Sequence, residues 1–286
     1  LPAGSIATHN DLAEALQLAR QIASPSAEAW ALWAQCLWYT GQGQFGRALD
    51  AVQGALEIAT AIDHHEWMAG SQSILGALYV DMLAPEEARP QLEQALARAE
   101  RLHSRHWIHH ATGCLAVACW LLDDRTQARV YLDAVLSPGT GMDSVHKRTC
   151  WARRAELALL EGDPSLALEI VERLIDSAPG MSPGRVIAFL WKVKAEALAA
   201  VGQTEQAGML LQAAVENAQA TGERTLLWPI HASLARLYKT THHRAEAATE
   251  SAAARRLILE LADTIPAPRL REGFLRRAHG MLEPVP

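Results

Sequence analysis

One alanine returns at a nearly constant interval along this chain. The copies are Ala48, Ala88, Ala128, Ala167, Ala207 and Ala247, so successive position numbers differ by 40, 40, 39, 40 and 40. Twelve residues before each alanine stands another small residue: Cys36, Gly76, Ala116, Ala155, Ala195 and Ala235. Such a period is typical of stacked two-helix units, because every unit must bring its helices close together at the same internal point. The spacing therefore predicts a repeat scaffold.

Each unit has two apolar stripes with helical spacing. If the units begin near Ala29, Ala69, His109, Arg148, Ala188 and Trp228, apolar residues recur at positions 4, 7, 8 and 11 and again at 20, 24, 27 and 28. Each set lies on one face of a helix. Turn residues such as those of 41–43, 84–87 and 162–165 separate the two stripes. We therefore expect an antiparallel helix pair in every unit.

The two ends of the pattern predict single helices. Residues 11–23 fit the second helix of a preceding unit, and residues 265–283 fit a capping helix that covers the end of the stack with Leu270, Phe274, Leu275 and Leu282. We expect one continuous domain over residues 1–286. Because the chain starts at Leu1 without a methionine, we expect it to be a fragment of a larger protein.

Two junctions are rich in helix-breaking residues. Residues 137–141 and 177–184 contain several prolines and glycines. We expect shorter helices beside these junctions. Either the stack of repeats bends around the fourth unit, or the two junctions are only loops that leave its course unchanged.

Composition and charge exclude several classes of function. The net charge is −6 with both signs interleaved, which disfavours nucleic-acid binding. The longest apolar run, Leu115–Leu122, is too short for a membrane span, and no secretory signal is present. The four cysteines form no CxxC motif, so we expect buried, reduced thiols in a cytoplasmic protein.

A glycine motif between the stripes of the first unit resembles a phosphate-binding loop. Residues 41–46 read GQGQFG, a literal G-x-G-x-x-G. A phosphate-binding glycine loop follows a β-strand and opens a helix, whereas this one lies between two predicted helices. We therefore interpret it as a turn.

The histidines form the most suggestive cluster of chemical groups. His103, His106, His109 and His110 lie within eight residues, and Cys114 continues the face of His106 and His110. The spacing of His106 and His110 permits zinc binding on one helix face. We favour polar residues at a helix end and predict no metal site, with zinc binding and a pH-sensitive contact as alternatives.

Paired carboxylates are the other candidate for catalysis. Glu156 and Glu196 share position 9 of neighbouring units, and Lys192 and Arg236 stand close to Glu196 in the pattern. This arrangement favours a row of ion pairs over an acid–base pair. We predict no enzyme and no cofactor.

The repeat pattern resembles the tetratricopeptide repeat (TPR). The segment SILGALYVDMLAPEEARPQLEQALARA, from Ser73 to Ala99, matches most offsets of the TPR signature. The period is longer than that of the usual TPR unit, so we expect helices longer by about one turn. The resemblance implies an all-α, right-handed TPR-like α-solenoid with six full repeats, the N-terminal orphan helix and the C-terminal capping helix. Long-period units of this kind are similar to the C-terminal regulatory regions of bacterial STAND-class signalling NTPases and large transcriptional activators.

The resemblance also implies a binding surface. In TPR stacks, first-helix positions 2, 5, 9, 12 and 13 point into a concave groove. Here they predict an apolar N-terminal end and a charged C-terminal end, with candidate binding residues Trp30, Trp33, Leu37, Thr40, Ala77, Val80, Val117, Trp120, Glu156, Lys192, Glu196, Arg236 and Lys239. Either the tryptophans at the N-terminal end anchor a peptide or helix, or they pack against neighbouring parts of a larger protein.

These expectations give two interaction hypotheses, beside a third of another class, a metal-dependent or hydrolytic activity around His103–His110. The first is a non-catalytic interaction domain that serves as the sensor or regulatory module of a bacterial signal-transducing NTPase. Its partner is a protein or peptide in the groove, or the attached NTPase or effector domains, with no nucleic acid and no membrane involved. The alternative is a free-standing TPR adaptor that binds a peptide or helix.

Overall fold

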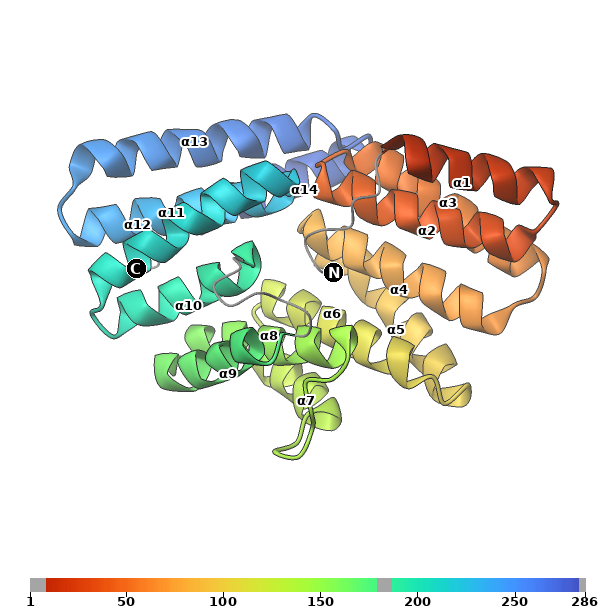
Figure 1. Cartoon of the computed structure of the whole chain (residues 1–286), viewed down its shortest axis with the longest axis horizontal. Coiled ribbons are helices and arrows are strands. Elements are labelled where there is room, and N and C mark those ends of the chain that lie inside the picture. The colour runs from red at the N-terminus through yellow and green to blue at the C-terminus, as the bar shows by residue number, and fades with distance from the viewer. Residues whose placement is uncertain (1–8, 179–186, 283–286) are drawn as a thin grey trace. The chain divides into compact units, whose positions relative to one another are not determined.

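The computed structural model describes residues 9–178 and 187–282, and its regular elements there are all helices (Figure 1). They are α1 (His9–Gln21), α2 (Pro25–Gly41), α3 (Phe45–Ala61), α4 (His65–Asp81), α5 (Pro85–Arg101), α6 (Arg105–Leu121), α7 (Arg125–Val135), α8 (Val145–Leu160), α9 (Pro164–Asp176), α10 (Ala188–Ala200), α11 (Thr204–Thr221), α12 (Arg224–Thr240), α13 (Arg244–Ala262) and α14 (Pro268–Leu282). Within these residues, α2 to α13 pack as consecutive pairs, which confirms the predicted all-α, TPR-like fold. None of the described helices is long and apolar enough to cross a bilayer.

The long period comes from long helices joined by short turns. Helices α2 to α6 each contain 17 residues. A residue with positive φ follows α1 and each of these helices at an even spacing: Ala23, Gly43, Asp63, Leu83, His103 and Asp123. In the first repeat the N–H of Gln44 donates to the Tyr39 carbonyl at 2.8 Å and that of Gly43 to the Thr40 carbonyl at 2.9 Å. These bonds close the helix end and turn the chain. They also confirm that the G-x-G-x-x-G segment is an inter-helix turn.

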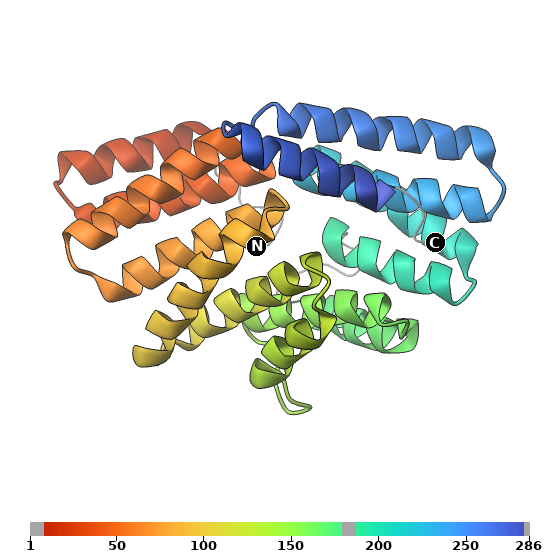
Figure 2. The ribbon, with the colours of Figure 1, turned by 180° about the vertical axis from the view of Figure 1, so that it is seen from behind.

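The small residues lie where the two helices of a pair cross. All twelve residues of the alanine pattern are buried. At Gly76 of α4, an added Cβ would stand 2.4 Å from Cγ of Leu92 on α5 and 3.3 Å from the carbonyl oxygen of Ala88. Interiors are packed too densely to absorb such overlap without movement. Figure 2 shows the ribbon from behind, the side on which the second helices α3 and α5 lie.

Three of the described helices beside the two breaker-rich junctions are short, as predicted, whereas α8 keeps 16 residues. Helix α7 has 11 residues and ends before Leu136, and α9 and α10 have 13 each. Residues 179–184 of the second junction lie outside the described residues.

The described chain divides into two compact units. The N-terminal unit contains α1 to α7 together with residues 264–273, and the C-terminal unit contains α8 to α13 together with residues 274–282. The orphan helix is α1, and the expected capping helix is α14, in which Phe274 is fully buried and Leu270, Leu275 and Leu282 are half-buried. A single domain over residues 1–286 stays a prediction.

In the N-terminal unit, the start of α3 contacts a residue far along the chain. Helix α3 begins after Gln44, whose side chain makes no capping hydrogen bond. Thr264 supplies the missing acceptors: its Oγ1 accepts from the N–H of Phe45 at 3.2 Å and its carbonyl oxygen accepts from the N–H of Gly46 at 3.0 Å. Helix α3 is therefore capped by a residue that follows the last repeat.

Candidate functional site

Four tryptophans from three consecutive first helices form one aromatic cluster. Trp30 and Trp33 come from α2, Trp67 from α4 and Trp107 from α6. The ring centroid of Trp33 lies 6.0 Å from that of Trp30, 4.4 Å from that of Trp67 and 5.3 Å from that of Trp107. Trp30 and Trp67 meet edge to face at 6.1 Å. These separations lie in or near the favourable range for aromatic pairs, so the rings hold one another in place.

Trp33 is the buried centre of this cluster. Its side chain is only 6% exposed, and its indole N–H donates to Oγ of the buried Ser71 at 2.9 Å. The expectation that Trp33 offers surface to a partner is therefore wrong. The ring fits because position 2 of the next repeat is Gly70, where an added Cβ would stand 2.4 Å from the ring.

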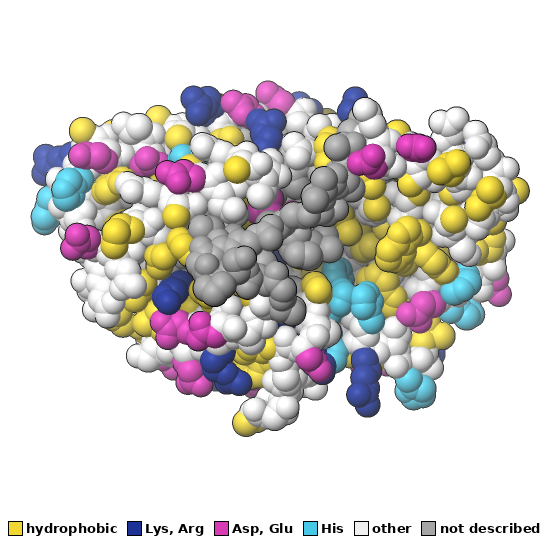
Figure 3. All heavy atoms as spheres, in the orientation of Figure 1, with side chains coloured by type: hydrophobic (Ala, Val, Ile, Leu, Met, Phe, Trp, Pro, Cys, Tyr) yellow, Lys and Arg dark blue, Asp and Glu magenta, His cyan; other side chains and the backbone are white. Residues whose placement is uncertain are grey.

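Trp30 is the exposed member of the cluster. Its side chain is 63% exposed, Trp67 is half-buried and Trp107 is buried. In Figure 3, hydrophobic and histidine side chains gather over α4 and α6. An exposed indole that rests on buried aromatic rings is a preformed apolar contact surface.

The histidines lie beside the tryptophans. The ring of His106 is 4.5 Å from that of Trp107, and the ring of His110 is 5.7 Å from it. His110 Nδ1 shares a hydrogen bond of 2.6 Å with Ser73 Oγ, and His109 Nδ1 donates to the Arg105 carbonyl at 2.6 Å. Burial lowers the pKa of His106, against the opposing charge of Glu66, so its ring is neutral at pH 7.

His103 takes no part in this arrangement. It is a turn residue with a φ of 53°. Across the described ranges, no three His, Cys, Asp or Glu side chains converge into a group that could hold a metal ion.

The cysteines of the first helices have the chemistry of core residues. Burial raises the pKa of the Cys36 thiol to about 12 and that of Cys119 to about 11. Such thiols stay protonated at neutral pH and are poor nucleophiles. Cys150 is also buried, and Cys114 is half-buried.

The other predicted groove residues of the N-terminal unit fall into two groups. Val80 and Val117 are 6% and 7% exposed and pack in one apolar cluster with Leu92 and Leu115, so they offer no surface, contrary to expectation. Trp120 is half-buried against that cluster. Surface remains at Leu37, Thr40 and Ala77, of which Leu37 is 39% exposed.

Glu196 is the centre of a charged cluster in the C-terminal unit. Its carboxylate accepts from Lys192 Nζ at 2.9 Å, from Arg236 at 3.1 Å and from Ser233 Oγ at 2.5 Å. Burial alone would raise the pKa of Glu196, but the charges of Lys192 and Arg236 and these hydrogen bonds outweigh it and hold the pKa below its usual value. The predicted ion-pair row is confirmed here.

The remaining charged candidates are Glu156 and Lys239. Glu156 pairs with Arg153 at 2.7 Å, and the same guanidinium lies 4.9 Å from the centroid of the Phe189 ring. Lys239 is exposed. The charges on this face are therefore largely paired with one another, and they fix side chains more than they attract a ligand.

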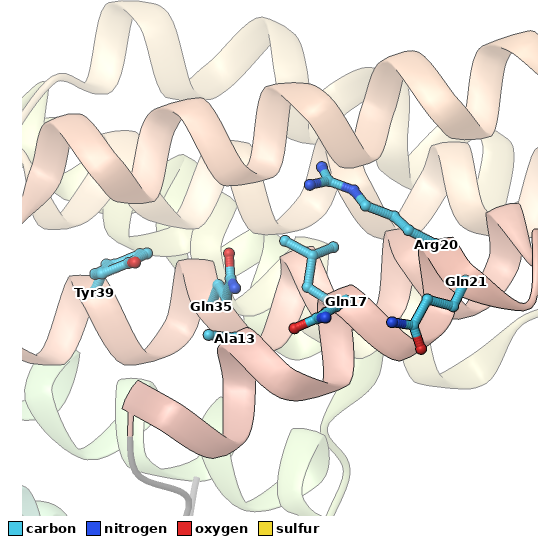
Figure 4. A pocket seen from close by; sticks show the side chains of 7 residues that line it. Ala13, Gln17, Arg20, Gln21, Gln35 and Tyr39 are labelled. Atoms are coloured by element: carbon cyan, nitrogen blue, oxygen red, sulfur yellow. The ribbon is translucent and has the colours of Figure 1, made fainter.

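A shallow hollow lies between α1 and α2 (Figure 4). It has a volume of about 480 Å³ and is lined by Ala13, Leu16, Gln17, Arg20, Gln21, Gln35 and Tyr39. A second hollow on α3 is lined by the residues one repeat period later, Gln53, Leu56, Glu57, Thr60 and Ala61. Because the same positions recur, the hollow is a surface groove of the repeat and not a site built for one ligand.

Trp67 and Trp107 are the members of the cluster that our sequence reasoning missed. Both stand two residues before position 1 of their repeats, outside the positions expected to face the groove. Their separation by one full repeat period was the available signal.

Known proteins support the repeat fold. Residues 26–101 match the tetratricopeptide repeat family. No curated protein matches the sequence significantly. Solved structures are also similar in fold. The chain is 12% identical to a Rap protein complexed with competence and sporulation factor, with a TM-score of 0.62, covering 94% of this chain and 79% of that one.

Two further solved structures of similar fold come from other proteins. BtubC (BKLC) from P. vanneervenii is 17% identical, with a TM-score of 0.53, over 74% of this chain and 89% of that one. A monomeric mutant of IFIT1 with Gppp-AAAA is 13% identical, with a TM-score of 0.56, over 95% of this chain and 64% of that one. At these identities the likeness concerns the fold alone. The chain is thus a TPR-like helical repeat protein whose residues 26–101 match the tetratricopeptide repeat family.

Proposed function

We propose that this chain is a non-catalytic interaction domain that binds a protein or peptide partner on the first-helix face of its N-terminal unit. The observation that carries the proposal is the 63% exposed indole of Trp30, supported by the buried ring of Trp33 and flanked by Trp67. Aromatic anchors dominate the energetics of protein interfaces. Covering the rest of this indole contributes about 3 kcal/mol.

Support by neighbouring rings lowers the entropic cost of binding. A side chain that is already held in one rotamer loses little freedom when a partner covers it. Trp30 contacts two rings, and Trp33 is in turn fixed by Ser71. Leu37 and Ala77 extend the accessible surface along α2 and α4, and His106 and His110 border it. The partner we propose therefore carries an apolar or aromatic side chain that seats against Trp30.

Most charged candidates of the C-terminal unit are held by other side chains of that unit. Lys192, Glu196 and Arg236 bind one another, so reversing Lys192 or Arg236 would place a second negative charge beside the Glu196 carboxylate and damage the fold. Lys239 is the better probe, because it is exposed. We expect Lys239→Glu to change the association rate and its salt dependence rather than the fold.

We further propose that the domain is the sensor or regulatory module of a bacterial signal-transducing NTPase. This rests on the resemblance of its long-period repeats to those regulatory regions. A Rap protein of similar fold, complexed with competence and sporulation factor, gives an example of such a scaffold bound to a factor. A free-standing adaptor is the alternative. A P-loop upstream of Leu1 in the complete reading frame would support the NTPase module, and a reading frame without one would contradict it.

A peptide-display selection tests the binding proposal. Random peptides are selected on the immobilised wild-type chain alone, and the selected peptides are then assayed on Trp30→Ala, with Met209→Ala on α11 as a control because Met209 is 60% exposed. We expect peptides rich in aromatic or large aliphatic residues that bind wild type and Met209→Ala but not Trp30→Ala. Peptides that bind all three proteins equally would contradict the assigned face.

A further inference from the structure

Helix α4 begins with a histidine as its N-cap. His64 has an extended backbone, and its Nδ1 atom accepts the backbone N–H of Trp67, the third residue of the helix, at 3.3 Å. Serine does the same at two other first helices, where Ser24 and Ser144 accept from the third residue of α2 and α8 at 3.4 Å. An N-cap satisfies an N–H group that the first turn of a helix leaves unpaired. At α4 this task falls to a side chain that titrates near neutral pH.

Protonation of the His64 ring removes the acceptor. A neutral imidazole that accepts at Nδ1 carries its hydrogen on Nε2. In the imidazolium both ring nitrogens carry hydrogens, so no orientation of the ring can accept the N–H of Trp67. The added positive charge also lies at the N-terminus of α4, where the helix dipole disfavours a cation. A serine hydroxyl does not titrate in this range, so the caps of α2 and α8 do not change.

Trp67 connects this cap to the aromatic cluster. It lies in the first turn of α4, and its ring centroid is 4.4 Å from that of Trp33 and 6.1 Å from that of Trp30. The His64 ring meets the Trp67 ring edge to face at 6.1 Å. Because Trp67 is only half-buried, the first turn of α4 helps to hold it in place. Loosening that turn therefore moves one of the two rings on which Trp30 rests.

The charged groups around His64 leave its ring as the acceptor. Helix α4 packs against α2, α3, α5 and α6, and its first turn lies beside the last turns of α3 and α5 (Figure 1). Across the described residues, no ion pair joins His64 to another side chain. The Glu66 carboxylate accepts instead from Ser104 Oγ at 2.7 Å. The titratable and charged groups at these helix ends and turns are Glu28, Glu57, Asp63, His65, Glu66, Arg98, Glu100, Arg101, His103, Arg105, His106, His109 and His110.

We propose that protonation of His64 uncaps α4 and weakens partner binding at the aromatic cluster, so that the N-terminal unit binds its partner less tightly in mild acid. This regulation rests on the proposed binding at Trp30. The cap is present while the imidazole is neutral, and it is lost as the pH falls through the range near 6.5 in which histidine takes up a proton. A partner that needs the ordered first turn therefore binds more tightly above this range than below it.

Hydrogen exchange at the Trp67 amide tests the loss of the cap. Its protection factor is measured by NMR on the full chain at about pH 7.5 and about pH 5.5, on either side of the histidine range. We expect wild-type protection to fall about three- to tenfold in acid, the size of one N-cap. His64→Ser supplies an acceptor that does not titrate and should keep its protection. His64→Ala lacks the acceptor and should be poorly protected at both pH values.

His65→Ser is the matched control. His65 is the first residue of α4 and is exposed, so this change removes a titrating charge from the same helix terminus and leaves the cap in place. Its Trp67 amide should respond to pH as the wild-type amide does. An equal acid response in wild type and His64→Ser would overturn the proposal. So would a response lost equally in His64→Ser and His65→Ser, because charge at the terminus would then be the cause.

Binding measurements test the regulation itself. A display-selected peptide that requires Trp30 and contains no Asp, Glu or His is titrated against each variant at both pH values. We expect wild type and His65→Ser to bind about three- to tenfold more weakly in acid. His64→Ser should bind equally at both pH values, and His64→Ala weakly at both. A wild-type Kd that does not change would overturn the regulation while leaving binding at Trp30 intact. If no selected peptide required Trp30, the proposed function would fail, and the regulation with it.

Discussion

The indole of Trp33 occupies the space in which a side chain at Gly70 would stand. A Cβ built at Gly70 would lie 2.4 Å from the Trp33 ring and 2.6 Å from that of Trp107. Two first helices can approach at this point only because the second one carries glycine. This contact fixes the buried half of the aromatic cluster and, through it, the orientation of Trp30.

Gly70→Ala is therefore expected to destabilise the fold by about 1–3 kcal/mol, because overpacking forces rings or backbone to move. Gly54→Ala is the control. Gly54 also lies inside a helix, but its added Cβ would meet only Leu32 at an ordinary 3.5 Å. It should gain about 0.5–1 kcal/mol from the higher helix propensity of alanine. Urea unfolding of both variants measures the difference, and equal stabilities would show that the rings are not packed in this way.

Enlarging the small residue of the pattern tests the register of the repeats. Ala128 and Ala207 are fully buried, whereas Ala220 of α11 is exposed. We expect Ala128→Leu and Ala207→Leu each to cost about 1–3 kcal/mol, and Ala220→Leu to leave the melting temperature nearly unchanged. Unchanged melting of the first two variants would contradict the assigned crossing points.

The ion-pair cluster around Glu196 predicts a defined pH dependence. The pKa of Glu196 is held below its ordinary value of 4.5. Its stabilising contribution is therefore present above that value and is lost as the pH falls through the lower folded-state pKa. Glu196→Gln should cost about 2 kcal/mol at pH 7, and its difference from wild type should shrink below pH 4. Glu205→Gln, at an exposed position of α11, serves as the control. A difference that does not vary with pH would contradict the ionic role.

Thr264 is expected to stabilise α3 across a separation of 219 residues from Phe45. Thr264→Val removes the hydroxyl acceptor and should cost about 1 kcal/mol, as the loss of an N-cap does. Thr264→Ser keeps the hydroxyl and should restore most of this loss. Thermal unfolding of the three proteins measures the effect, and equal losses in both variants would indicate that packing rather than capping is responsible.

The repeat architecture could be predicted because the information for it is local. Ala88 and Gly76 are small since two backbones cross there, and the same requirement recurs in every unit. Turn positions such as Gly43 and Asp63 follow from the length of the helices between them. The cap of α3 by Thr264 could not be predicted in this way, because no periodic signal links residues 219 positions apart.

The candidate site was predicted only in part, because exposure depends on the neighbour's side chain. Trp33 and Val117 occupy groove positions and were expected to be accessible, but Gly70 leaves room for the first, and the core cluster that contains Val80 encloses the second. Trp30 has the same kind of position and stays exposed. The repeat positions thus predicted which residues share the first-helix face. Which of them are buried and which are accessible depends on the packing of their neighbours.

We propose that Trp30 anchors a partner while Trp33 supports the fold. The most direct test measures, for a peptide obtained in the display selection, the Kd and the free energy of unfolding of wild type, Trp30→Ala and Trp33→Ala. We predict that Trp30→Ala weakens binding at least tenfold, a loss of about 1.4 kcal/mol or more, with unfolding changed by less than about 1 kcal/mol. Trp33→Ala should lose about 3–5 kcal/mol of stability. Wild-type affinity in Trp30→Ala would contradict the account.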